Sequence, residues 1–166
     1  MKYIIIIFAA MLFAGNAKAQ TYDTIPPYQK DSTLPKFLLL NEDSTWFNTA
    51  QLPKKTPVVI IFFNPDCSHC QHEAEELVKE IDKIKNIFFL WTTYAPTFEE
   101  IKQFADQYGL SKYKNMHFYK DPNYTIPSFY RLEMTPFMAG YDKKGMLIKT
   151  WTAGAKPDDL KEALLK

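Results

Sequence analysis

The sequence contains very few cysteines and almost no arginine, and its charges nearly cancel. Only two of the 166 residues are cysteine, and Arg131 is the single arginine among twenty basic residues. The formal net charge of +1 indicates neither a nucleic-acid partner nor an acidic tail. No internal repeat or low-complexity tract interrupts the chain. Its length and its 46% hydrophobic content therefore indicate one globular domain with a single core.

The apolar run at the N-terminus is too short for a membrane-spanning helix. It covers the 13 residues 3–15, whereas a bilayer requires roughly 20. Lys2 precedes it, and Ala17-Lys18-Ala19 follows with small residues where a signal peptidase cuts. We therefore expect residues 1–19 to be a signal peptide cleaved before Gln20, which places the mature chain in the periplasm or otherwise outside the cytoplasm. A retained membrane anchor is the alternative.

The two cysteines, Cys67 and Cys70, lie three positions apart. A disulfide between such close residues constrains little of the unfolded chain, so it adds little as a structural staple in an exported protein. Zinc is a weaker interpretation, because a Cys-x-x-Cys half-site needs two further ligands and the chain offers only His69, His72 and His117. The spacing therefore indicates reversible redox chemistry, without a resident metal or cofactor.

The cysteine pair follows a run that is typical of a buried strand. Residues 58–63 are continuously apolar and rich in β-branched and aromatic side chains, and Asn64-Pro65-Asp66 ends the run. From Cys67 to about Ile84, apolar residues recur at helical spacing and predict an amphipathic helix. The charged residues expected on its solvent side are Glu73, Glu75, Glu76, Lys79, Glu80 and Lys83. The cysteines therefore lie where a buried strand leads into the first turn of a helix.

This position favours a thiolate at Cys67. Unpaired backbone N–H groups and the positive end of the helix dipole stabilise negative charge in the first turn of a helix. Cys70 lies one turn further along and is more shielded. We therefore interpret Cys67 as the attacking nucleophile and Cys70 as the resolving thiol that releases a mixed disulfide.

The strand, the segment Phe63-Asn64-Pro65-Asp66-Cys67-Ser68-His69-Cys70 and the helix together resemble the thioredoxin superfamily. The nearest branch is the exported TlpA/ResA-like thiol–disulfide oxidoreductases. The resemblance covers residues 34–166 and leaves residues 20–33 as an N-terminal linker. It implies an α/β thioredoxin fold, with helices flanking a central mixed β-sheet and an added N-terminal β-hairpin. Residues 37–40 and 45–47, around a polar turn, match that hairpin.

The remaining expected elements follow the order of that fold. They are a strand over 86–92, a helix that the capping box Thr97-x-x-Glu100 opens and Gly109 closes, strands over 137–141 and 146–152, and a final helix beginning near Pro157.

The resemblance also implies a cis-proline facing the cysteines. The matching segment is Met134-Thr135-Pro136-Phe137, although an X-Pro bond is ordinarily trans. By this resemblance, Pro136 packs over a redox-active disulfide between Cys67 and Cys70, and the Thr135 backbone pairs with an extended substrate segment.

Three positions depart from the thioredoxin pattern. Ile61 stands where thioredoxin has a buried aspartate that assists proton transfer from the resolving thiol. Asp66 replaces the usual tryptophan; its carboxylate can cap the helix, but its charge raises the pKa of Cys67. His69, when protonated, stabilises the Cys67 thiolate and makes the disulfide more oxidising, as the histidine at the same place in DsbA suggests. The alternative is an exposed His69 that is neutral near pH 7.

The sequence therefore predicts an extracytoplasmic thiol–disulfide oxidoreductase, expected as a monomer. Its partners would be protein thiols and disulfides and a redox protein of the membrane or periplasm, not nucleic acid. The direction of transfer stays open, because Asp66 and His69 act in opposite senses on Cys67. The alternative is a copper-delivery protein of the same fold. Such carriers usually place three residues between their cysteines and use a distant histidine, for which only His117 is available.

Overall fold

A single mixed sheet runs through the part of the chain that the computed structural model describes, residues 24–94 and 97–165. Its strands are β1 (Leu38–Leu40), β2 (Trp46–Asn48), β3 (Val58–Phe62), β4 (Phe88–Thr93), β5 (Met116–Lys120), β6 (Phe137–Tyr141) and β7 (Leu147–Thr152). They lie in the order β2-β1-β5-β4-β3-β6-β7. The three central strands β5, β4 and β3 are parallel, and every other pairing is antiparallel. The predicted thioredoxin-like α/β fold with its N-terminal hairpin is confirmed.

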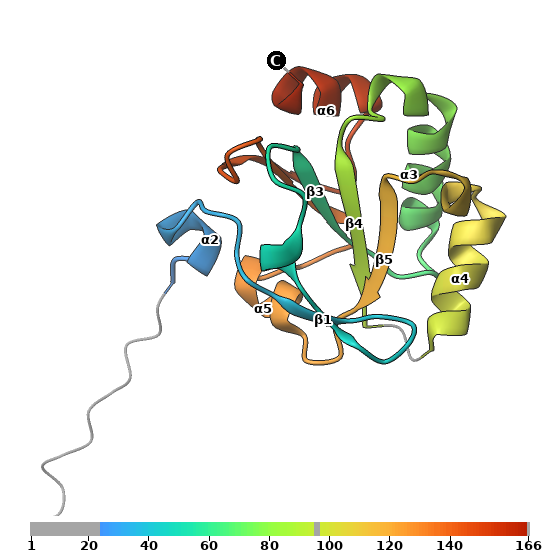
Figure 1. Ribbon diagram of the computed structural model, residues 1–166, viewed down its shortest axis with the longest axis horizontal. Helices are drawn as coiled ribbons and strands as arrows, with labels where there is room; N and C mark the ends of the chain where they lie inside the picture. Colours follow the sequence, from blue (N-terminus) through green and yellow to red (C-terminus); the bar gives the residue numbers. More distant parts are fainter. Residues whose placement is uncertain (1–23, 95–96, 166) are drawn as a thin grey trace, which may run out of the picture.

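Helices cover both faces of this sheet. They are α2 (Pro27–Lys30), α3 (Ser68–Lys79), α4 (Phe98–Gln107), α5 (Thr125–Tyr130) and α6 (Pro157–Leu164). Figure 1 shows α3 and α4 on one side and α2 and α5 on the other. Within the described residues, none of the helices combines the length and apolar character needed to cross a membrane. The predicted signal peptide and its cleavage site before Gln20 lie outside the described residues.

Strand β3 lies between β4 and β6 in the interior of the sheet, and all five of its residues are buried. Val59 and Ile61 face a core that side chains of α3, α4 and α6 complete. Val58 and Ile60 face a second core, closed by α5 and the β1 strand. A strand that contributes to two cores must be apolar on both faces, which explains the continuous hydrophobic run in the sequence.

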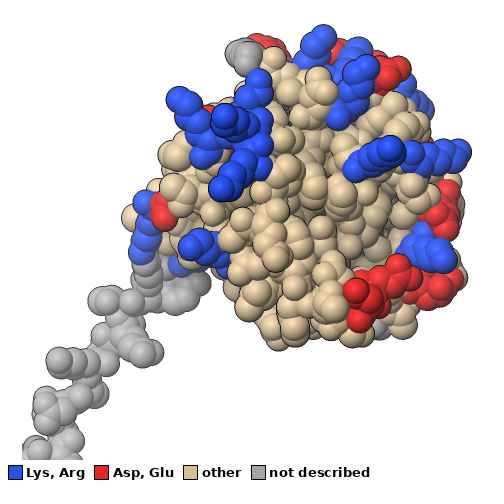
Figure 2. Space-filling model, in the orientation of Figure 1, with Lys and Arg blue, Asp and Glu red and all other residues tan. Residues whose placement is uncertain are grey.

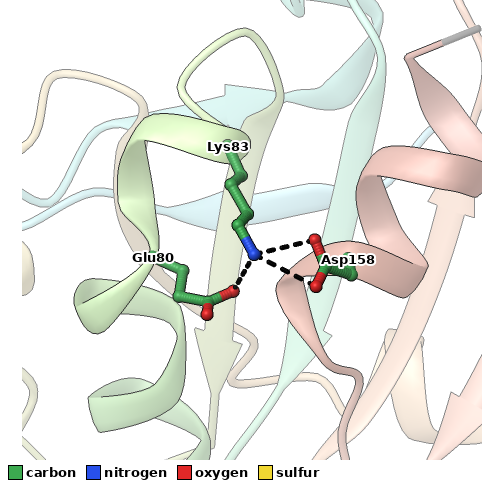
Figure 3. A network of polar contacts seen from close by, with 3 residues as sticks. All are labelled: Glu80, Lys83 and Asp158. Atoms are coloured by element: carbon green, nitrogen blue, oxygen red, sulfur yellow. Dashed lines mark hydrogen bonds and ion pairs between the residues drawn. The ribbon is translucent and has the colours of Figure 1, made fainter.

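Helix α3 is shorter than the sequence predicts. It ends at Lys79, and a 3-10 turn over Ile81–Lys83 follows. Lys83 Nζ lies 2.8 Å from Glu80 Oε2 and 2.9 Å from Asp158 Oδ1, so one ammonium bridges this turn and the first turn of α6 (Figure 3). The apolar periodicity that suggested a helix reaching Ile84 therefore spans two elements that pack on the same core.

Strand β5 and helix α5 have no counterpart in the sequence-based expectation. Burial does not alternate along β5, and α5 is a six-residue helix that contains Pro127, so neither shows a clear period. Asp121 between them is completely buried, and its carboxylate accepts hydrogen bonds from the N–H groups of Thr125 and Ile126 at 3.0 and 2.8 Å. This side chain therefore fixes the start of α5 through its backbone donors.

The N-terminal segment lies against the domain. The Leu147 N–H donates to Ser32 O at 2.7 Å and the Leu34 N–H to Gly145 O at 2.8 Å, beside an isolated bridge between Thr33 and Met146. Residues 24–33, which the sequence assigns to a linker, thus include the one-turn helix α2 and a stretch that borders β7.

Replacing Leu77 by alanine is expected to destabilise the fold strongly. Leu77 is completely buried on α3 within the core next to the cysteines, so the variant should lose about 2–5 kcal/mol of unfolding free energy in a urea titration. Lys79→Ala, two residues on and with a 61% exposed side chain, should change it by less than about 0.5 kcal/mol. Equal losses in the two variants would contradict the placement of the core.

Candidate active site

A tight turn carries the chain from β3 into α3. Asn64 O accepts a hydrogen bond from the Cys67 N–H at 3.0 Å, and Asn64 Oδ1 accepts one from the Asp66 N–H, also at 3.0 Å. Cys67 is the N-cap residue, and the helix begins at Ser68. Cys67 Sγ therefore lies at the helix start, where backbone N–H groups have no intrahelical partner.

The two sulfurs occupy different environments. Cys67 is half-buried, and its thiol donates a hydrogen bond to Thr135 O at 3.6 Å. Cys70 is completely buried, and its sulfur accepts a hydrogen bond from the Asn64 N–H at 3.5 Å. Both are thiols in this structure. One sulfur is therefore open to solvent and the other lies behind it.

This difference separates the two pKa values. Burial alone raises the pKa of Cys67, but hydrogen bonds from the Thr135 side chain and from the N–H groups of Cys70 and His69 outweigh it and lower the pKa to about 7. Burial raises the pKa of Cys70 to about 12, against the opposing hydrogen bond from Asn64. At neutral pH the accessible sulfur is thus about half ionised, and the buried sulfur keeps its proton.

The second wall of the site comes from the loop before β6. The Thr135–Pro136 peptide bond is cis, as the resemblance implies. Pro136 is buried, and Phe137 directly after it pairs with Phe62 at the end of β3. This antiparallel pairing brings Thr135 against Cys67 across 68 positions of sequence.

Asp66 and His69 act less directly than the sequence suggests. Both side chains are exposed. The expectation that the Asp66 carboxylate caps the helix is wrong, because Cys67 is the N-cap and no side chain caps it. His69 contributes to the lowered pKa of Cys67 through a hydrogen bond from its backbone N–H, which has a smaller effect than the bonds from Thr135 and Cys70. Ile61 is completely buried, and its apolar side chain supplies no carboxylate beside the cysteines.

Glu73 is the residue that the sequence misplaced. Predicted on the solvent side of α3, it is only 6% exposed, and its carboxylate accepts hydrogen bonds from the Ala155 N–H at 3.1 and 3.3 Å. Burial raises its pKa to about 7, with the Ala155 bond opposing. A Cβ at Gly154, whose φ is +99°, would collide with this carboxylate. Its spacing, three residues after Cys70 and four before Leu77, was the available signal for burial.

The histidine needed for copper delivery lies elsewhere. The His117 ring stacks on Phe88 at 4.1 Å between centroids, and Phe88 pairs with Val58 at the start of β3, whereas the cysteines follow its end. Across residues 24–94 and 97–165, no group of three His, Cys, Asp or Glu side chains is arranged to hold a metal ion.

Residues 46–166 match the model of the thioredoxin-like domain family, and the chain belongs to that family. A search of curated proteins finds no significant match. The predicted membership of the thioredoxin superfamily is thereby confirmed.

Solved structures with this fold include a secreted disulfide oxidoreductase and a thiol:disulfide interchange protein. A secreted Mycobacterium tuberculosis disulfide oxidoreductase homologous to E. coli DsbE is 22% identical, with a TM-score of 0.62 over 76% of this chain and 92% of its own. StoA from Bacillus subtilis is 15% identical, with a TM-score of 0.58 over 79% and 97%. A thiol:disulfide interchange protein from Chlorobium tepidum TLS is 16% identical, with a TM-score of 0.63 over 87% and 97%. At such identities the similarity is one of fold.

The pH dependence of the alkylation rate at Cys67 should reflect the lowered pKa of its thiol. In the reduced protein, the rate of iodoacetamide modification at Cys67, mapped by mass spectrometry, is expected to rise with a midpoint near pH 7. Thr135→Val removes a hydrogen bond to the thiolate and should raise the midpoint by about one unit. Ser68→Ala, at an exposed neighbouring position, should leave it unchanged. An unchanged midpoint in Thr135→Val would contradict the role of that hydroxyl.

Glu73 should make the protein less stable as the pH rises. Its pKa in the folded state, about 7, exceeds its ordinary value of about 4.5, so the folded protein keeps a proton that the unfolded chain releases. The stabilisation is complete below about pH 4 and is lost as the pH rises through 7. Relative to Glu73→Gln, the unfolding free energy of the wild type should fall by on the order of 3 kcal/mol across that range. If the unfolding free energies of the wild type and Glu73→Gln, measured by urea titration, change with pH in the same way, this assignment is refuted.

Proposed function

We propose that the chain is an extracytoplasmic thiol–disulfide oxidoreductase that exchanges disulfides with other proteins through Cys67 and Cys70. The observation that carries the proposal is the asymmetry of the pair. One sulfur is accessible with a pKa of about 7, and the other is buried with a pKa of about 12, one helical turn away. An accessible thiolate that has a protected thiol behind it is what two-step thiol–disulfide exchange requires.

In the reducing direction, the Cys67 thiolate attacks one sulfur of a substrate disulfide. A Cys67–substrate disulfide forms, and the other substrate sulfur leaves as a thiolate. Cys70 then gives up its proton and attacks Cys67 Sγ, which forms the Cys67–Cys70 disulfide and expels the second substrate thiolate. Because Ile61 offers no carboxylate, we assign the proton of Cys70 to a departing substrate thiolate.

The surface beside the cysteines suits an extended polypeptide. Met134, next to Thr135, is 53% exposed. We propose that the Thr135 backbone beside it pairs with an extended substrate strand. Tyr94 follows the end of β4 and stacks on Phe62 of β3, and its ring also stacks on Tyr124. Both tyrosines are exposed. The exposed side chains of Met134, Tyr94 and Tyr124 would give an extended substrate apolar surface to contact beside the Cys67 sulfur.

The pKa of Cys67 supports the reducing direction. A value of about 7 matches that of thioredoxin, about 7, rather than that of DsbA, about 3.5. A modestly stabilised thiolate leaves the disulfide only weakly oxidising. Asp66 and His69 are exposed, so solvent screens their opposing effects. We further propose that the protein works as an exported monomer, which a membrane or periplasmic redox protein returns to the dithiol state.

A trapping experiment tests the exchange. Cys70→Ser expressed in the native host should accumulate mixed disulfides on Cys67, because the resolving thiol is absent, and non-reducing gels with mass spectrometry should identify the bound proteins. Cys67→Ser, which keeps the buried thiol, is the matched control and should trap none. If Cys70→Ser traps no protein while the wild type cycles between dithiol and disulfide, protein exchange is not the function.

The reduction potential tests the direction. Equilibration of the wild type with glutathione buffers should give a value closer to about −270 mV than to about −120 mV. A value near the latter would make the protein an oxidant.

A further inference from the structure

The end of the sheet opposite the cysteines is strongly basic. The cysteines follow the end of β3, whereas the starts of β3, β4 and β5 and the turn after β6 meet at the other end. A cavity of about 540 Å³ opens there, and Lys55, Lys85, Lys114 and Lys143 each reach it from a different one of these segments. None of the residues lining this cavity is acidic.

Two smaller hollows extend this basic surface. One of about 430 Å³ shares Lys55 and Lys143 with the first, and one of about 370 Å³ shares Lys85 and Lys114. We call the lysines of the three hollows the basic pole: Lys36, Lys54, Lys55, Lys85, Lys112, Lys114, Lys143 and Lys144. In Figure 2, basic side chains predominate over the upper part of the face, and acidic ones group at its lower right.

Among the described residues, few acidic side chains line the basic pole. All eight lysines are exposed, and none of them forms an ion pair within the part of the chain that the structure describes. The acidic residues lining the hollows are Asp82 and Asp142. Asp142 Oδ1 already accepts hydrogen bonds from the N–H groups of Lys144 and Met146. A chain that is nearly neutral overall therefore keeps half of its sixteen described lysines at one end, where only two acidic side chains line the hollows.

The chemistry of this surface favours an extended anionic layer as its ligand. Lysine is a compact charge on a flexible stem, without the fork that lets arginine recognise a single phosphate or carboxylate in two places. Protein interfaces are depleted in lysine and depend on arginine, tyrosine and tryptophan. Of those three residue types, only Tyr113 lines the three hollows. Three adjoining hollows also cover more surface than one small anion occupies.

We infer that the basic pole binds the headgroups of anionic phospholipids at a membrane surface. Each lysine brought near such a surface strengthens binding about fivefold. A molecule bound in this way directs the opposite end of the sheet, and with it Cys67, away from the bilayer. The basic pole contains neither cysteine, so the lipid-binding inference can be tested separately from the proposed oxidoreductase function.

Co-sedimentation of the full chain with lipid vesicles tests this inference. The wild type should bind vesicles of phosphatidylcholine with 30% phosphatidylglycerol at about 0.05 M salt, bind pure phosphatidylcholine far less, and be released at about 0.5 M salt. Lys85→Gln/Lys114→Gln/Lys143→Gln should weaken the binding by on the order of 100-fold. The N-terminal apolar run is the same in every variant and contributes equally.

The matched control is Lys30→Gln/Lys102→Gln/Lys149→Gln, which removes the same charge outside the basic pole and should weaken binding far less. The inference is overturned by equal losses in the two triple variants, by equal binding to both vesicle types, or by no vesicle binding. Salt-sensitive binding to an acidic protein without binding to vesicles would equally overturn it, and would assign the pole to a protein partner. Far-UV circular dichroism and thiol titration check that both variants are folded.

Discussion

The pairing of β3 with β6 is the constraint on which the site depends. Phe62 and Phe137 are register partners, so the turn that leaves β3 and the loop that enters β6 must meet at one edge of the sheet. This pairing brings Cys67 and Thr135 together. The register holds because both strands are buried throughout, and a shift by one residue would turn the apolar side chains of each face to the wrong core.

The sequence predicted the elements whose physical signal is local. The buried run of β3, the N-cap at Thr97 and the end of α4 just before Gly109 all appear as expected. The thiol pair was predictable because its spacing and its place after a strand carry the chemistry. What the sequence could not show was set by tertiary contacts. The burial of Glu73 depends on a backbone N–H 82 positions away, and the role of Thr135 depends on a pairing between distant strands.

The predicted end of α3 was also wrong because tertiary packing decides where the helix stops. The core beneath α3 continues beneath the 3-10 turn that follows it, so apolar spacing alone does not mark where the helix ends. Asp66 failed as a cap because the Asn64 side chain already holds the turn and the helix begins one residue later than that role requires. Net charge is likewise a sum, and near-neutrality conceals a separation of basic and acidic side chains that exists only in three dimensions.

The two edges of the sheet determine where an extended polypeptide could pair with the protein. The outer strand β2 has only three residues, and the start of β7 is partly covered by the segment around Thr33. Long open edges recruit any extended chain by backbone pairing and lead to aggregation. A short edge and a partly covered one leave few such places. Under the proposed function, an extended substrate would therefore meet the protein at the loop beside Cys67 rather than along an open edge of the sheet.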